Sequence, residues 1–109
     1  MQIPTLTSGT ERGINVTYED LMQEINNDVL FERIRQNKLW GIQRHHIGTW
    51  LAILGEEFGE VCQAAQSHLK LVSAKESDAN NLYEECIHLA AVASAIAEQV
   101  KASERTLNE

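Results

Sequence analysis

The chain contains one proline, Pro4, so no proline interrupts a helix at any later position. Beyond it, apolar residues recur every three or four positions in three stretches, which is the spacing of an amphipathic helix. We predict helices over residues 18–37, 47–73 and 79–103. No stretch alternates apolar and polar residues as a half-buried strand does, so the predicted fold class is all-α.

The predicted helical region begins at a recognisable start signal. Thr17 is a favourable N-cap, and Asp20, three residues later, supplies the acidic partner of a capping box. Residues 1–15 are predicted to be an irregular N-terminal segment. Residues 16–105 are predicted to form a single helical domain, because a chain of 109 residues has room for one core.

The third predicted helix carries a run of small residues: Ala90, Ala91, Ala93, Ser94, Ala95 and Ala97. Small side chains permit close helix contact, and three helices of this length bury little apolar surface alone. We therefore expect an antiparallel helical bundle completed by oligomerisation, as a homodimer or homotetramer. A monomeric three-helix domain is the alternative.

Charge and apolar content exclude several classes of function. A formal net charge of −7 argues against binding to nucleic acid or to a membrane surface, since such a protein normally shows a basic face. No apolar run approaches the roughly 20 residues of a membrane span, and residues 1–10 lack the layout of a signal peptide. The expected compartment is the cytoplasm, where Cys62 and Cys86 are interpreted as small core residues with reduced thiols.

Two acidic stretches interrupt the apolar parts of the second and third helices. They are Glu56-Glu57-Phe58-Gly59-Glu60 and Glu84-Glu85-Cys86-Ile87-His88. At about 100° per residue, Glu57 and Glu85 fall on the apolar faces of their helices. Glu56 and Glu84 point outward. A carboxylate on an apolar face is costly unless a positive charge meets it, so the pattern indicates a bound cation.

Each inward-facing acid has a second potential ligand one turn later. Glu60 follows Glu57 and His88 follows Glu85, so each pair shares a helix face. If the two helices pack antiparallel, the four side chains converge, and a set rich in oxygen ligands suits Mg²⁺ or Mn²⁺. The alternative is a solvated acidic face that pairs with Lys or Arg.

The residues around the first acidic stretch resemble a known family. Trp40-Gly-Ile-Gln43-Arg-His45, followed by Trp50-Leu-Ala-Ile-Leu-Gly-Glu56-Glu57-Phe-Gly-Glu60, is similar to the MazG-like all-α nucleoside triphosphate pyrophosphohydrolases, a similarity that covers residues 33–98. That family is recognised by Glu-Glu-x-x-Glu followed by Glu-x-x-Asp. The resemblance implies hydrolysis of the α–β phosphoanhydride of a nucleotide to a monophosphate and pyrophosphate, as in nucleotide-pool house-cleaning. It also implies Mg²⁺ ligation by Glu57, Glu60 and Glu85.

One position departs from the family pattern, because His88 stands where the family has aspartate. A neutral imidazole is a softer ligand and carries no negative charge. Three consequences stay open: a preference for Mn²⁺, an empty Mg²⁺ site, or a weakened enzyme.

The resemblance implies roles for further residues. The candidate catalytic acids are Glu56, Glu57 and Glu60, and either Glu56 or Glu60 would orient the attacking water. The candidate substrate-binding residues are Trp40, Gln43, Arg44, His45 and Lys38. In this set the basic residues would meet phosphates and Trp40 would stack on a base. Surface solubility or core packing is the alternative for each.

Two other functions compete with this interpretation. Glu85-x-x-His88, with a glutamate from the neighbouring helix, is half of a ferritin-like di-iron site that dimerisation would complete. A non-catalytic helical interaction module with a decayed site is the third possibility, and His88 favours it.

Overall fold

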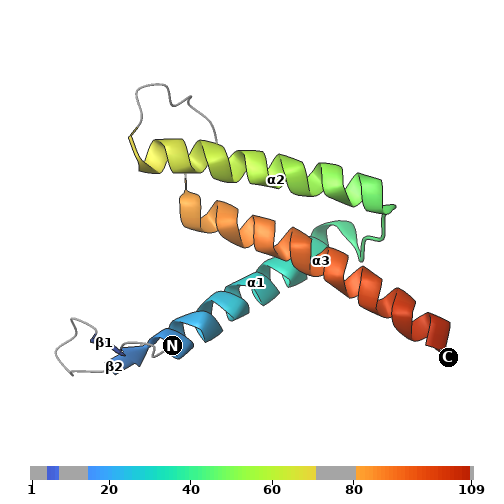
Figure 1. Cartoon of the computed structure of the whole chain (residues 1–109), viewed down its shortest axis with the longest axis horizontal. Helices are drawn as coiled ribbons and strands as arrows, with labels where there is room; N and C mark the ends of the chain where they lie inside the picture. Colours follow the sequence, from blue (N-terminus) through green and yellow to red (C-terminus); the bar gives the residue numbers. More distant parts are fainter. Residues whose placement is uncertain (1–4, 8–14, 71–80, 109) are drawn as a thin grey trace.

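The computed structural model describes residues 5–7, 15–70 and 81–108 of the chain. These form two short strands, β1 (Thr5–Thr7) and β2 (Asn15–Thr17), and three helices, α1 (Tyr18–Trp40), α2 (Ile47–His68) and α3 (Leu82–Asn108). The helices α2 and α3 run side by side in opposite directions, and α1 crosses α3 at an angle (Figure 1). The predicted all-α class is confirmed for the three helices.

The two strands were not predicted. β1 and β2 pair antiparallel, with Thr5 opposite Thr17 and Leu6 opposite Val16. At residues 5–7 and 15 this differs from the irregular N-terminal segment expected over residues 1–15, of which residues 1–4 and 8–14 lie outside the described residues. A strand of three residues is too short to display an alternating pattern, so its partner rather than its own sequence defines it.

At the start of each helix, a side chain accepts a hydrogen bond from a backbone amide of the first turn. Thr17 Oγ1 accepts a hydrogen bond from the Asp20 amide at 3.1 Å, and Asp20 Oδ2 accepts one from the Thr17 amide at 3.1 Å. This confirms the predicted capping box. His46 is the N-cap of α2, and its Nδ1 accepts a hydrogen bond from the Gly48 amide at 3.0 Å. At the start of α3, Asn81 Oδ1 accepts from the Glu84 amide at 3.1 Å.

The helix ends differ from the predicted ones by several residues. α1 continues to Trp40 and stops at Gly41, whose positive φ of 74° suits a glycine and whose amide donates to the Asn37 carbonyl. α2 ends at His68, earlier than predicted. The predicted end of the second helix and start of the third, residues 73 and 79, lie outside the described residues.

The core lies between α2 and α3. The buried apolar residues are Trp50 and Ala64 on α2, with Ile87, Ala91 and Val92 on α3. Ala64 and Ala91 have no exposed surface, because small side chains let the two helix backbones approach closely. None of the residues of α1 is buried.

Many large apolar residues in and beside the three helices remain exposed. The large apolar side chains on the surface include Met22, Ile25, Leu30, Phe31, Ile34, Ile47, Leu51, Phe58 and Leu69. Cys62 and Cys86 are also exposed, so their interpretation as core residues was wrong. Both lie at the edge of an apolar arc that a single chain does not cover. Among the described helices, none is sufficiently long and apolar to cross a membrane.

Candidate metal centre

Four potential ligands converge between α2 and α3. Glu57 and Glu60 come from α2, and Glu85 and His88 come from α3. One ligand atom from each residue lies within 4.8 Å of all the others. Because the two helices are antiparallel, residues that share a face on each helix meet at the same level. The structure therefore brings together the four residues that the sequence singled out.

Burial separates the inward acids from their neighbours. Glu85 is buried, with 6% of its surface exposed, and Glu57 is partly buried. The adjacent Glu56 and Glu84 are exposed. The prediction that Glu57 and Glu85 face inward is confirmed. Glu56 lies outside the four-residue cluster.

Two carboxylate oxygens in the cluster make no hydrogen bond. Within the described part of the chain, Glu57 Oε2 and Glu85 Oε2 are the buried side-chain atoms that make no hydrogen bond. A buried carboxylate oxygen without a donor is costly. A divalent cation would satisfy both atoms, and the donor set of three carboxylates and one imidazole fits such an ion.

The proximity of the acids changes their ionisation. Burial raises the pKa of the Glu57 carboxyl above its ordinary value, and the charge of Glu60 raises this pKa further. The pKa of Glu85 is raised for the same first reason, and its contact with Glu60 adds to the rise. The nearby His88 opposes both shifts. The two acids therefore hold their protons more tightly than ordinary glutamates do.

The imidazole of His88 lies between the cluster and α1. Its Nδ1 is 3.4 Å from Glu85 Oε2. Its Nε2 is 3.9 Å from Glu32 Oε2 and 3.9 Å from Glu84 Oε1. The two ring nitrogens thus face different carboxylates.

Glu32, on α1, is a fifth acid at this site. Arg35 donates to its two carboxylate oxygens at 2.7 and 2.8 Å, and Gln36 donates at 2.8 Å. The hydrogen bonds from Arg35 hold the pKa of Glu32 below its ordinary value. Sequence reasoning missed Glu32. The spacing of Glu32 and Arg35 predicts a local ion pair, but nothing local reveals its distance from His88.

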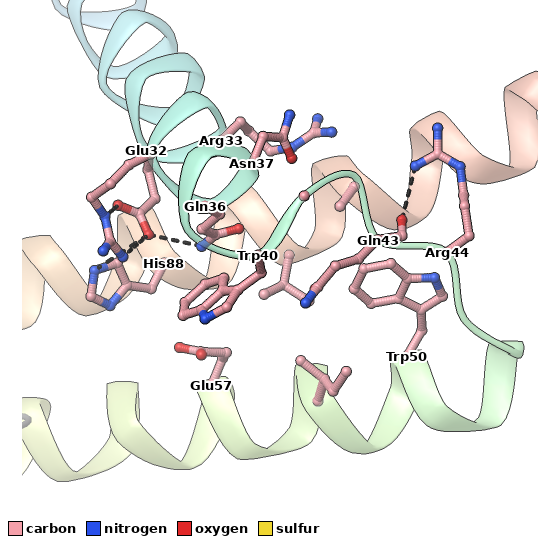
Figure 2. Close-up of a pocket in the computed structure, with 15 residues that line it drawn as sticks. Glu32, Arg33, Gln36, Asn37, Trp40, Gln43, Arg44, Trp50, Glu57 and His88 are labelled. Atoms are coloured by element: carbon pink, nitrogen blue, oxygen red, sulfur yellow. Dashed lines mark hydrogen bonds and ion pairs between the residues drawn. The ribbon is translucent and has the colours of Figure 1, made fainter.

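A cleft of about 400 Å³ opens beside the cluster. Glu57 and His88 line one end, and the remainder is lined by the end of α1, the link to α2 and further residues of α2 and α3 (Figure 2). The lining residues include Arg33, Arg35, Gln36, Asn37, Trp40, Gln43 and Arg44. Trp40 is 60% exposed, and its indole projects into the cleft between His88 and Gln43 (Figure 2).

The predicted substrate residues divide into two groups. Trp40, Gln43 and Arg44 line the cleft, whereas Lys38 and His45 do not. Lys38 is exposed near the end of α1 and is not among the residues that line the cleft.

His45 packs against the core and holds the link. Its ring contacts Trp50 edge to face, with ring centroids 4.7 Å apart. Gln99 accepts a hydrogen bond from the His45 amide at 3.0 Å and donates one to the His45 carbonyl at 2.7 Å. The Trp50 indole also donates to Gln99 Oε1, at 2.7 Å. Trp50 is thus buried, with its ring against His45 and its indole N–H hydrogen-bonded.

Two arginines, Arg33 and Arg44, lie at the other end of the cleft, where both approach Glu98. Arg33 donates to Ser94 Oγ at 3.0 Å and forms an ion pair with Glu98. Arg44 donates to the Gln43 carbonyl at 2.9 Å and lies 3.9 Å from Glu98. Arg33 was another residue that sequence reasoning missed, because only the crossing of α1 over α3 places it beside Arg44.

Comparisons with known proteins do not indicate a function for this site. No family model, curated protein or solved structure matches the chain. The donor set, the burial of two unpaired oxygens and the charge distribution along the cleft are therefore the observations that bear on function.

Proposed function

We propose that this protein is a metal-dependent nucleoside triphosphate pyrophosphohydrolase that cleaves the α–β phosphoanhydride to give a nucleoside monophosphate and pyrophosphate. The observation that carries the proposal is the convergence of Glu57, Glu60, Glu85 and His88 at one end of a cleft, with two buried carboxylate oxygens left unpaired. The resemblance of the sequence around Trp40 and Glu57 to MazG-like enzymes suggests the reaction. A cytoplasmic role in nucleotide-pool house-cleaning would follow.

The four clustered residues are the proposed ligands. Their carboxylates favour Mg²⁺, and the His88 imidazole makes Mn²⁺ a possible alternative. A divalent cation held there would supply positive charge to the phosphate oxygens and make water a better nucleophile at neutral pH.

The three acids of α2 have different proposed roles in the reaction. Glu57 is partly buried with an unpaired oxygen, which suits a ligand. Glu60 is partly buried one turn later, and it is the better candidate to orient the attacking water. Glu56 is exposed and outside the cluster, so it would act only through a rearranged side chain.

The cleft offers complementary groups to the rest of a nucleotide. Arg44 and Arg33 lie at the end away from the four clustered residues, where both approach Glu98 and where charge-assisted hydrogen bonds to phosphate would be favourable. The exposed indole of Trp40 presents a flat surface on which a base could stack. A net charge of −7 is compatible with an anionic substrate only if positive charge is concentrated locally, and the arginines and a cation would provide it.

Oligomerisation belongs to the same proposal. A groove between α2 and α3, lined by Leu51, Leu54, Gly55, Phe58, Leu89 and Ala93, is almost wholly apolar. Exposed apolar surface of this extent in a single chain favours a bundle completed by further copies, as a homodimer or homotetramer.

Sedimentation equilibrium tests the oligomer. A dimer or tetramer is expected for the native chain, and Leu51→Glu should weaken it because it places a charge in the groove. Ala52→Glu, next to it but outside the groove, is the matched control. A native chain that is monomeric at micromolar concentration would contradict this part of the proposal.

A nucleotide panel tests the reaction. Pyrophosphate release is measured with dNTPs and NTPs in Mg²⁺ or Mn²⁺, and the monophosphate product is identified. Turnover that disappears in Glu57→Gln supports the proposal, and no turnover with any nucleotide would refute it. Iron-dependent oxygen uptake would instead support the ferritin-like site, and failure to bind any divalent cation would support a non-catalytic module.

A further inference from the structure

His88 presents a different chemical problem from the other three proposed ligands. A carboxylate offers equivalent oxygens, whereas a neutral imidazole carries one proton on one of two nitrogens and binds a cation only through the other. In this structure Nδ1 faces the cluster, 3.4 Å from Glu85 Oε2. Binding through Nδ1 therefore requires that the proton reside on Nε2.

Two carboxylates face Nε2, and they differ in how firmly they are held. Glu32 Oε2 and Glu84 Oε1 are both 3.9 Å away. The Glu32 side chain is only 10% exposed, whereas that of Glu84 is 62% exposed. Arg35 and Gln36 fix the Glu32 carboxylate through three hydrogen bonds of 2.7–2.8 Å. Glu32 is the partner with a defined position, and it comes from a different helix.

We propose that Glu32 is a positioning residue for the metal centre: its carboxylate accepts a hydrogen bond from the Nε2–H of His88 and so keeps Nδ1 free of a proton and available to the cation. Metal-binding histidines generally donate their other ring N–H to a carboxylate or carbonyl, which fixes both the tautomer and the ring orientation. The separation of 3.9 Å is longer than a hydrogen bond of about 3 Å, so the proposal requires the ring and the carboxylate to move closer when an ion binds.

This role connects α1 to a centre whose proposed ligands lie on α2 and α3 (Figure 2). Arg35 and Gln36 orient Glu32, Glu32 orients His88, and His88 reaches the cluster. An aspartate at position 88 would need no such partner, because it has no tautomer to select. The inference rests on the metal site of the proposed function but not on nucleotide hydrolysis.

Metal affinity measured by calorimetry tests the proposal without turnover. Glu32→Gln should weaken Mn²⁺ or Mg²⁺ binding about 10-fold or more, the effect typical of an outer carboxylate on a metal-binding histidine. Glu84→Gln, which removes the exposed acid at the same distance from Nε2, should change it less than about 2-fold if only the fixed carboxylate orients the ring. Equal losses in the two variants would overturn the proposal.

A second background separates tautomer control from general electrostatics or misfolding. In a His88→Asp chain there is no imidazole to orient, so adding Glu32→Gln should change the affinity less than about 2-fold if orientation is its role. The same loss in both backgrounds would show that Glu32 acts only through charge or folding, and would overturn the proposal.

The ring nitrogens can also be observed directly. In the native chain saturated with diamagnetic Mg²⁺, ¹⁵N chemical shifts of His88 should report a proton on Nε2 and none on Nδ1, and Glu32→Gln should raise the Mg²⁺ concentration at which this tautomer is reached. A native His88 with the proton on Nδ1 would refute the inference. A native chain that binds no divalent cation would overturn both this proposal and the proposed function. Metal binding with the expected variant pattern but no hydrolysis would refute the nucleotide reaction alone.

Discussion

The helices α2 and α1 both contact α3, but they do so by different means. α2 packs against it through buried apolar residues, including Trp50 and Ala64. α1 has no buried residue, and polar contacts connect it to α3. Arg33 reaches Ser94 and Glu98, Glu32 approaches His88, and the Tyr83 hydroxyl donates to Asp28, a bond that raises the pKa of Tyr83 to about 12.

The two helices therefore make different contributions to the candidate site. The close packing of α2 on α3 fixes the four clustered side chains relative to one another. α1 contributes charges and an aromatic ring to the cleft, through exposed and partly exposed groups. Exposed ion pairs stabilise a fold by no more than about 1 kcal/mol each. The contacts that hold α1 against α3 are therefore weaker than those that hold α2.

The largest expected effect comes from the packed pair of helices. Glu85→Gln should lower metal affinity at least about 100-fold, because it removes a proposed ligand rather than an outer partner. Glu84→Gln, one residue away and exposed, should leave it nearly unchanged. Calorimetry with Mn²⁺ measures both. Similar losses in the two variants would mean that total charge, and not the inward geometry, governs binding.

The two tryptophans sharpen the contrast in stability. Trp50→Ala should lower the free energy of unfolding by about 3–5 kcal/mol, because it empties a buried site between α2 and α3. Trp40→Ala, at an exposed position on α1, should change it by no more than about 0.5 kcal/mol. Urea denaturation of the metal-free protein gives both values. Equal destabilisation would indicate that α1 packs as firmly as α2.

The arginine end of the cleft should show a smaller effect on substrate. Arg44→Ala should raise KM for a nucleoside triphosphate about 10-fold, the loss expected for one charge-assisted hydrogen bond. Lys38→Ala is the control, since Lys38 lies outside the cleft lining, and its KM should stay within about 2-fold. If Lys38→Ala raised KM as much, long-range charge rather than contact in the cleft would explain the result.

The smallest expected effect is on the pH dependence of stability, which should have one sign for the acids of the cluster and the opposite sign for Glu32. The pKa values of Glu57 and Glu85 are raised in the folded state, so the metal-free protein should gain stability as pH falls from neutral towards the ordinary glutamate pKa. The pKa of Glu32 is lowered, so its contribution is present above the ordinary value and is lost as pH falls through its folded pKa.

Urea denaturation across this pH range measures the two slopes. Glu85→Gln should flatten the upper part of the profile, and Glu32→Gln the lower part. A saturating divalent cation should reverse the upper slope, because protons then compete with the ion for the acids. An upper slope that is unchanged in Glu85→Gln would contradict the assignment.

Local patterns carried the sequence predictions that succeeded. Helical periodicity identified the three helices and the inward direction of Glu57 and Glu85, since both depend only on residues within one helix. The capping box at Thr17 is also local. The family resemblance and the reaction that it implies stay predictions.

The features that the sequence could not provide depend on contacts between distant segments. Glu32 reaches His88 and Gln99 reaches His45 only because of how the helices cross. The same limitation affected the interpretation of His45, whose ring packs on Trp50. The pairing of β1 with β2 is likewise a relation between two segments that neither reveals alone.

The contact of Gln99 with the link has a consequence for which residues position 99 can tolerate. Its oxygen accepts from two donors, the His45 amide and the Trp50 indole, while its NH₂ group donates to the His45 carbonyl. Only a primary amide of this length combines both functions. Glutamate has the same shape but would set a carboxylate oxygen against the carbonyl. Position 99 is therefore selective for hydrogen-bonding pattern rather than for size.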